Sequence, residues 1–367
     1  MTTRVVLVGA GAIAASHLAA VAESGRAEVT WVVDVDEARA ADVAARHGVR
    51  RSGGSLAAAL AGGADLVVLG TPPGTHLPLA TEALEAGVPV LTEKPPALSL
   101  AEMDRLIAVQ DRTGARVGVV FQHRFGGAGL RAAELLAPRG DGSPGPLGRP
   151  LVATCDTLWF RAPAYFEVPW RGRWEVEGGG PTMGHGIHQF DLLLALLGPW
   201  SAVRAMAARL SRDTDTEDVS AAVVQFESGA VATIVNSVLS PREVSSIRVD
   251  TDRATLELEH LYGYDDAGWR LTPAPGYADL AAVFPGAPGR PSSHAAQWAA
   301  VLDALVSGAP LPVPVEVARV TLELAAATYA SAFTGREVRR GEIGAGDPFY
   351  ERMQGPGAPW PPVKAPR

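Results

Sequence analysis

Residues 4–15 of the chain are RVVLVGAGAIAA, an apolar run followed by two closely spaced glycines and an alanine-rich run. The apolar run predicts a buried strand, and the alanine-rich run predicts a helix that continues to about Ser24. Between them, residues 9–14 match Gly-x-Gly-x-x-Ala, a pattern that permits a tight turn and leaves backbone N–H groups at the helix start to hold a pyrophosphate. The chain has 40 glycines, so an ordinary turn is the alternative, and the flanking strand and helix support the prediction. The residues expected to line this turn are Gly9, Gly11, Ala12 and Ile13.

Short apolar runs continue to alternate with Ala/Leu/Glu-rich segments as far as residue 121. This alternation predicts βαβ units and a parallel sheet with helices on both faces. The strand-like runs are RVVLVG, EVTWVVDV, ADLVVLG, VPVLTE and RVGVVF. We therefore expect residues 1–121 to form a doubly wound, dinucleotide-binding α/β domain.

Asp34 ends the second strand-like run, at the place where an acid accepts the ribose hydroxyls of a dinucleotide. A carboxylate at this position repels a 2′-phosphate, so the sequence favours NAD over NADP. Arg39 would weaken that preference, and capping of the next helix by Asp34 is the alternative.

The loop Thr71-Pro72-Pro73-Gly74-Thr75-His76 follows the fourth strand-like run. Nucleotide cofactors lie at this carboxyl edge of a parallel sheet. We expect Thr71, Pro72 and His76 to line the cofactor cleft, with His76 neutral and not catalytic. A simple strand-to-helix turn is the alternative.

Lysine is rare in this chain. Of 32 basic Lys and Arg residues only Lys94 and Lys364 are lysine, and Lys364 lies in the proline-rich end of the sequence. Lys94 stands in Thr92-Glu93-Lys94-Pro95-Pro96, directly after the fifth strand-like run. An ammonium is a compact donor whose pKa falls when it is buried, and guanidinium has neither property. The sequence therefore predicts a chemical role for Lys94.

The pattern changes after the Pro/Gly-rich residues 138–150. Strand-like runs follow one another with short turns, and helical patterns return at residues 294–307 and 315–333. We expect an α/β domain with an open, mostly antiparallel sheet over residues 122–352 and a loose tail over 353–367. The runs LVATCDTLWF and AVATIVNSVL are apolar on both faces, which predicts that one face of the sheet meets another subunit.

Composition excludes several classes of protein. The formal charge is −8, and no basic cluster goes beyond Arg339-Arg340, so we expect no nucleic-acid partner. The single cysteine, Cys155, excludes an intramolecular disulfide and has no metal-binding spacing around it. Arg4 before an apolar run resembles a signal peptide, but the glycine spacing favours a strand and turn, and no other run is long enough to span a membrane. We expect a cytoplasmic protein that does not bind membranes.

Residues 178–198, GGGPTMGHGIHQFDLLLALLG, place His185 and His188 at the start of an apolar helix. We expect the glycines to let this segment approach a cofactor and a substrate closely. Two imidazoles three positions apart can face one ion, but zinc needs a third ligand, and this segment offers only Asp191. We therefore predict no metal site, and the remaining alternative is that both histidines only form hydrogen bonds within a domain interface.

Taken together, these motifs resemble the Gfo/Idh/MocA oxidoreductase family along nearly the whole chain. The motifs that carry the likeness are Gly-x-Gly-x-x-Ala, the acid after the second strand, Thr-Pro-Pro with His76, Glu93-Lys94-Pro95, Arg124, Trp170-Arg171-Gly172, Gly-Gly-Gly before the Gly-x-His-x-x-Asp helix, and residues 330–336. The resemblance implies a Rossmann domain and a second domain whose open sheet packs against another subunit in a homodimer or homotetramer. It also implies hydride transfer between a nicotinamide and a secondary alcohol of a sugar, cyclitol or glycoside.

The resemblance assigns roles to individual residues. Lys94 matches the family's catalytic lysine, His188 matches its acid/base histidine, and Glu93 and Lys94 would lie at the cofactor. Many relatives carry an aspartate four residues before that histidine, where this chain has Gly184, and His185 or Asp191 would take its place. The expected substrate contacts are Lys94, Arg124, Arg171, Trp174, His185 and His188. An NAD(H)-binding sensor without turnover is the alternative function.

Overall fold

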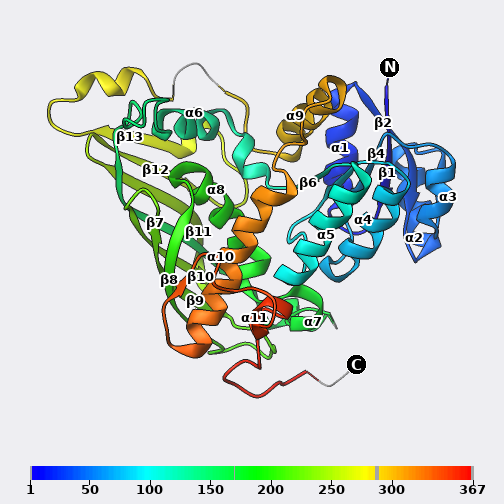
Figure 1. Ribbon diagram of the computed structural model, residues 1–367. Coiled ribbons are helices and arrows are strands. Elements are labelled where there is room, and N and C mark those ends of the chain that lie inside the picture. The colour runs from blue at the N-terminus through cyan, green and yellow to red at the C-terminus, as the bar shows by residue number, and fades with distance from the viewer. Residues whose placement is uncertain (1, 169, 286–288, 365–367) are drawn as a thin grey trace. The chain divides into compact units, whose positions relative to one another are not determined.

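The computed structural model describes residues 2–168, 170–285 and 289–364. The chain divides into two compact units. Unit 1 contains residues Met1–Phe121 and His294–Arg319, and unit 2 contains Gln122–Ser293 and Val320–Arg367. Both are drawn in Figure 1.

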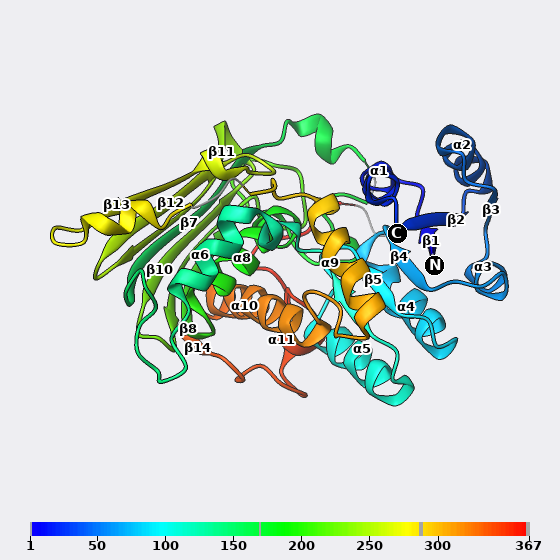
Figure 2. The same cartoon turned by 90° about the horizontal axis from the view of Figure 1, so that it is seen from above.

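Among the described residues of unit 1, six parallel strands form a sheet in the order β3-β2-β1-β4-β5-β6. The strands are β1 (Thr3–Val8), β2 (Ala27–Val33), β3 (Arg51–Gly53), β4 (Leu66–Leu69), β5 (Val90–Thr92) and β6 (Val117–Val119). The helices are α1 (Ala14–Ser24), α2 (Glu37–His47), α3 (Leu56–Ala61), α4 (His76–Glu85), α5 (Leu100–Thr113) and α9 (His294–Ser307). Figure 2 shows α1 and α2 on one side of this sheet and α4 and α5 on the other. This is the expected doubly wound Rossmann fold.

The helix α9 differs from the sequence-based expectation, which placed it in the second domain. It packs against α1, and Trp298, Val301 and Leu302 join the core formed by β1, β4 and α1. An amphipathic pattern predicts that a helix buries one face, but it does not predict which sheet that face covers.

In unit 2 the described residues form an eight-stranded sheet in the order β13-β12-β11-β7-β10-β9-β8-β14. Neighbouring strands are antiparallel except β7 and β10, which are parallel. The strands are β7 (Pro150–Phe160), β8 (Trp200–Ala208), β9 (Val219–Phe226), β10 (Val231–Ser237), β11 (Leu239–Thr251), β12 (Ala254–His260), β13 (Trp269–Pro273) and β14 (Val338–Arg339). This mostly antiparallel sheet confirms the expected fold class.

Helices cover one face of the unit 2 sheet. The helices of unit 2 are α6 (Gly127–Leu136), α7 (Trp174–Glu177), α8 (Ile187–Leu197), α10 (Val315–Thr334), which begins in unit 1, and α11 (Pro348–Glu351). In Figures 1 and 2, α6, α8 and α10 lie on the same side of the sheet, and α8 contacts β7 and β11. The apolar α8 is buried along almost its whole length, which fixes the start of that helix firmly on the sheet.

The described part of the C-terminal tail is held against unit 2, and the expectation of a loose tail was wrong. The indole of Trp360 donates a hydrogen bond to the carbonyl of Asp215, and the backbone N–H of Val363 donates to the Asp215 carboxylate. The Lys364 ammonium donates to the carbonyl of Phe166. Proline-rich sequence prevents a regular helix or strand but does not prevent such capping contacts.

Candidate cofactor and proton-transfer sites

The glycine turn after β1 has the backbone that a pyrophosphate site needs. Gly9 has a φ of +101°, and a Cβ at this position would lie 2.6 Å from the carbonyl oxygen of Gly70. Only glycine fits, because two backbones pass each other here. Around Gly11 no heavy atom of the described residues lies within 4 Å of the Cβ position, and no described side chain caps α1. The N–H groups of Ala14 and Ser16 already donate to the carbonyls of Gly11 and Ile13, so the donors for an anion would be the N–H groups of the turn itself, at residues 11–13.

Asp34 ties the end of β2 to this turn. Its Oδ2 accepts a hydrogen bond from the Ala10 N–H at 2.8 Å, and its Oδ1 accepts from the Asp36 N–H at 2.9 Å and from the Arg39 guanidinium at 2.8 Å. Burial raises the pKa of Asp34, but the hydrogen bonds from Arg39, Ala10 and Asp36 outweigh burial and lower it overall. The cap of α2 is Asp36, so the capping alternative for Asp34 does not apply.

His76 was expected to line the cofactor cleft, but it lies between two loops and contacts both of them. Its ring is completely buried, with Nδ1 3.0 Å from the carbonyl oxygen of Pro95 and Nε2 2.9 Å from that of Thr71. Burial lowers its pKa. The half-exposed Thr71 hydroxyl accepts a hydrogen bond from Thr75 at 2.7 Å, so the loop after β4 is held from within and by His76.

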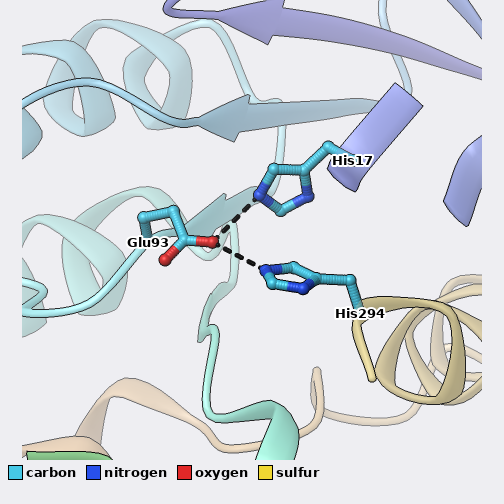
Figure 3. Close-up of side chains that lie close together, drawn as sticks. All are labelled: His17, Glu93 and His294. Carbon is cyan, nitrogen blue, oxygen red and sulfur yellow. Dashed lines mark hydrogen bonds and ion pairs between the residues drawn. The ribbon is translucent and has the colours of Figure 1, made fainter. Parts of the chain in front are cut away.

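Glu93 and Lys94 follow β5 and differ in environment. The Glu93 carboxylate is buried and faces His17 and His294 (Figure 3), so a contact of Glu93 with the cofactor would come from its backbone. Lys94 is half-buried, and its N–H donates to the second Glu93 oxygen at 3.2 Å. The peptide between Lys94 and Pro95 is cis. Lys94 thus follows the carboxyl end of β5, an inner strand of the parallel sheet, and comes directly after a buried acid.

In unit 2, His188 lies in the first turn of α8, directly after a π-helix at Thr182–Gly186 that contains His185. The His188 ring is buried and stacks on His123, with ring centroids 4.7 Å apart. His123 in turn meets the edge of His260 at 5.1 Å, and Tyr262 lies 6.1 Å from His188. Sequence reasoning missed His123, His260 and Tyr262, because no local pattern connects them with the histidine helix.

The His260 ring is electrically neutral. Burial lowers its pKa to about 4. Its Nε2 lies 3.1 Å from the side-chain amide of Gln189, which donates to it. At neutral pH His260 therefore adds no positive charge beside His123 and His188.

The glycine run packs against protein, so the expectation that it approaches a ligand needs correction. A Cβ on Gly179 would lie 2.1 Å from the Tyr329 hydroxyl, and one on Gly180 would lie 2.0 Å from the carbonyl oxygen of Glu217. The buried Glu217 carboxylate accepts hydrogen bonds from the Gly180 N–H at 2.9 Å and the Thr182 N–H at 3.1 Å. These contacts position the turn that carries both histidines.

Asp191, one of the two residues expected to support His188, is occupied elsewhere. Arg124 binds it through two hydrogen bonds of 2.5 and 2.7 Å, and Thr321 donates to it at 3.2 Å. Burial raises the pKa of Asp191, and Arg124 opposes that shift. The same pairing holds Arg124, an expected substrate contact, and removes the third ligand of a zinc site at His185 and His188.

Two other expected substrate contacts lie in different environments. The Arg171 guanidinium stacks between rings, 3.8 Å from the Tyr165 centroid and 4.3 Å from that of Trp170. Trp174 is buried against Tyr329, and its indole N–H donates to a backbone carbonyl at 2.8 Å. Trp174 does not fit the expected role of a substrate contact, because it is buried and its one polar atom already donates to a carbonyl inside the unit. His185 meets Trp159 edge to face at 4.9 Å and is only partly buried.

The fold of unit 1 and its glycine turn define a dinucleotide-binding protein of the Rossmann class. Residues 3–121 match the model of the oxidoreductase family with an NAD-binding Rossmann fold, and residues 143–257 match the GFO/IDH/MocA C-terminal domain. The chain belongs to the Gfo/Idh/MocA oxidoreductase family, as the motifs predicted, and NAD is the cofactor of that family's Rossmann domain.

Individual relatives support this assignment. The chain is 30% identical to inositol 2-dehydrogenase of Rhizobium meliloti (strain 1021) over 65% of this chain and 69% of that one. It is 29% identical to the rhizopine catabolism protein MocA of Rhizobium meliloti over 53% of this chain, and the match spans only 57% of MocA. Among solved structures, the WlbA dehydrogenase from Bordetella pertussis in complex with NADH and UDP-GlcNAcA has a TM-score of 0.77 at 28% identity, covering 92% of this chain and 99% of that chain.

Proposed function

We propose that this protein transfers a hydride between NAD(H) and a secondary alcohol or ketone of a sugar, cyclitol or glycoside. The observation that carries the proposal is Lys94, half-buried at the carboxyl end of β5 in a parallel sheet whose first strand leads into a glycine turn without a side-chain cap. The relatives named as inositol, D-apiose and D-glucoside dehydrogenases support the substrate class.

The proposed cofactor site uses residues that the fold has already placed. Gly9, Gly11 and the start of α1 would hold the pyrophosphate, and Asp34 would accept the ribose hydroxyls beside Arg39. When bound, NAD supplies the hydride acceptor for the alcohol carbon.

Two residues would handle the proton. Lys94 would donate a hydrogen bond to the reacting oxygen, and His188 would accept the hydroxyl proton as the carbonyl forms; in reduction the proton would pass back from His188 to that oxygen. The positive charge that would form on His188 is not repelled by His260, because the lowered pKa of His260, about 4, keeps that imidazole neutral. Arg124, Arg171 and His185 remain the proposed substrate contacts.

A sensor without turnover is the second candidate, because Asp191 is engaged by Arg124 and Thr321 and position 184 is glycine. Reduction of NAD measured with inositols, hexoses, glycosides and sugar nucleotides separates the two functions. Turnover with any member supports the dehydrogenase. Tight NADH binding without turnover on the whole panel supports the sensor.

We expect NAD to bind at least tenfold more tightly than NADP, a difference of about 1.4 kcal/mol. The Asp34 carboxylate repels a 2′-phosphate, and Arg39 offsets part of that repulsion through its 2.8 Å contact. Arg39→Ala should therefore increase the preference for NAD, and Asp34→Ala should reduce it. Dissociation constants from fluorescence titration test this, and equal binding of both cofactors would contradict it.

We also propose that the protein forms a homodimer or homotetramer through the helix-free face of the unit 2 sheet. Apolar side chains on this face are exposed: Met206 by 78%, Val152 by 52% and Val223 by 49%. Light scattering at micromolar concentration should show a multiple of 38.2 kDa, and Val223→Arg should shift the protein toward the single chain. A particle of 38.2 kDa for the unchanged protein would overturn this proposal.

None of the helices in the described residues is long and apolar enough to cross a membrane. We place the protein in the cytoplasm as part of the proposal, since its one cysteine, Cys155, is buried and free.

A further inference from the structure

Three buried polar side chains from distant parts of the sequence meet inside unit 1. His17 comes from α1, Glu93 from the residue after β5, and His294 from the start of α9. Both Nε2 atoms lie 3.1 Å from the same Glu93 oxygen, Oε1 (Figure 3). The proposed reaction does not use these three residues directly, although Glu93 immediately precedes Lys94.

Trp298 on α9 fixes where the proton of His17 lies. An indole N–H only donates, and Trp298 Nε1 is 3.2 Å from His17 Nδ1, so Nδ1 must accept. The ring proton therefore lies on Nε2, which donates to Glu93. Burial lowers the pKa of His17, which keeps the ring neutral. Burial raises the pKa of Glu93, but the two imidazole contacts outweigh it and lower that pKa overall, so the acceptor is a carboxylate.

A metal ion is the obvious alternative occupant. The nitrogen and oxygen atoms of His17, Glu93 and His294 lie within 4.8 Å of one another, and two imidazoles with one carboxylate are a common zinc ligand set. Zinc bound at His17 Nε2 would move the ring proton to Nδ1. That proton would then point at the N–H of Trp298, leaving two donors face to face. Trp298 therefore disfavours a metal and favours the hydrogen-bonded cluster.

The cluster fixes the residue before Lys94 from three sides. The Glu93 N–H donates to the carbonyl of Leu69 at 2.9 Å, its Oε1 accepts from the two imidazoles, and its Oε2 accepts from the Lys94 N–H at 3.2 Å. A buried carboxylate with satisfied oxygens is rigid, because losing any one donor leaves charge unpaired. Because Glu93 and Lys94 are joined by a peptide bond, a fixed Glu93 also restricts the position of the Lys94 backbone.

We propose that His17 and His294 hold the Glu93 carboxylate so that Lys94 is set in place, which makes the three residues positioning residues for the lysine. This inference rests on the proposed role of Lys94. It also gives a reason for α9 to belong to unit 1, since His294 is the first residue of that helix. Misplacement of a reacting group by about 1 Å costs on the order of 100-fold in rate, so even a small shift is measurable.

The test compares two replacements of His294. His294→Leu removes the donor, whereas His294→Gln places an amide N–H near the former Nε2. With NAD and the panel substrate that is turned over fastest, we expect His294→Leu to lower kcat roughly tenfold with little change in NADH affinity. We expect His294→Gln to restore kcat to within about threefold of the unchanged protein.

A double-mutant cycle identifies the residue through which His294 acts. In a Lys94→Ala protein, His294→Leu should cost less than about twofold, because the lysine that it positions is gone. An equal loss in both backgrounds would show general structural damage and overturn the inference. If Lys94→Ala itself keeps full turnover, the proposed function fails; if only His294→Leu is harmless, the inference alone fails.

A measurement on the unchanged protein makes the inference independent of activity and of variant folding. Nitrogen-15 NMR of labelled histidine should show His17 neutral with its proton on Nε2, and adding zinc chloride should leave that signal unchanged. A proton on Nδ1, or a zinc-dependent shift of His17 with bound metal after dialysis, would overturn the positioning role in favour of a metal site.

Discussion

Lys94→Ala is expected to lower kcat by roughly 100-fold or more, which corresponds to about 2.7 kcal/mol of transition-state stabilisation. The side chain at position 94 would donate to the reacting oxygen, and alanine leaves that oxygen without its donor. NADH binding should persist, because the glycine turn and Asp34 are untouched. Steady-state kinetics and fluorescence titration of NADH measure the two quantities.

Arginine at position 94 is the matched control. It keeps the positive charge, but its planar fork cannot present one compact donor or give up a proton. We expect Lys94→Arg to be nearly as slow as Lys94→Ala. Recovery of full turnover by arginine would mean that charge alone is needed and would remove the hydrogen-bonding role of the lysine.

His188→Ala should cause a loss of the same order, because it removes the group that accepts the hydroxyl proton. His185→Ala should cost less, since His185 sits against Trp159 and would only contact the substrate. Near-normal turnover of His188→Ala at neutral pH would overturn the assignment and make His185 the candidate base.

The dinucleotide half of the molecule could be predicted because its signals are local. The φ of +101° at Gly9 belongs to a strand, a turn and a helix that adjoin in sequence, and Asp34, which contacts the Ala10 N–H, ends the next strand of the same βαβ unit. The alternation of apolar runs and helices then leads to the parallel sheet, since βαβ crossovers have one hand.

Features that depend on distant partners could not be predicted. His17 and His294 look like unrelated surface histidines in the sequence, and only the packing of α9 brings them to Glu93. His123 and His260 likewise reach His188 only through the folded sheet. Trp174 was misplaced for a similar reason, because an aromatic beside an arginine fits both a sugar contact and a core.

The glycine run at residues 178–180 was expected to allow close approach to a ligand, but Gly179 and Gly180 pack against other parts of the protein. Close approach of a backbone to a ligand and close approach to another part of the protein both require glycine. In this chain Gly179, Gly180 and Gly186 face Tyr329, Glu217 and Asn236, respectively. Substitution of a glycine in this run should therefore change the stability of unit 2, and this change can be measured.

Gly180→Ala is expected to lower the free energy of unfolding of unit 2 by about 3 kcal/mol, through overpacking and strained hydrogen bonds. The new Cβ would lie 2.0 Å from the carbonyl oxygen of Glu217, whose side chain is already fixed by the Gly180 and Thr182 N–H groups. The backbone at Gly180 or Glu217 must shift, because the nearest atom is a backbone oxygen and not the end of a flexible side chain. Calorimetry should show a Tm lower by roughly 6 to 12 °C.

Gly184→Ala is the matched control, four residues along the same segment. Among the described residues no heavy atom lies within 4 Å of a Cβ at Gly184, and the position is in the π-helix, where alanine is tolerated. We expect an unchanged Tm or a rise equivalent to less than about 1 kcal/mol, since alanine restricts the unfolded chain. If Gly180→Ala is as stable as Gly184→Ala, glycine is not required at position 180 for packing against Glu217. Close approach of the backbone to a ligand would then be the better explanation for this glycine.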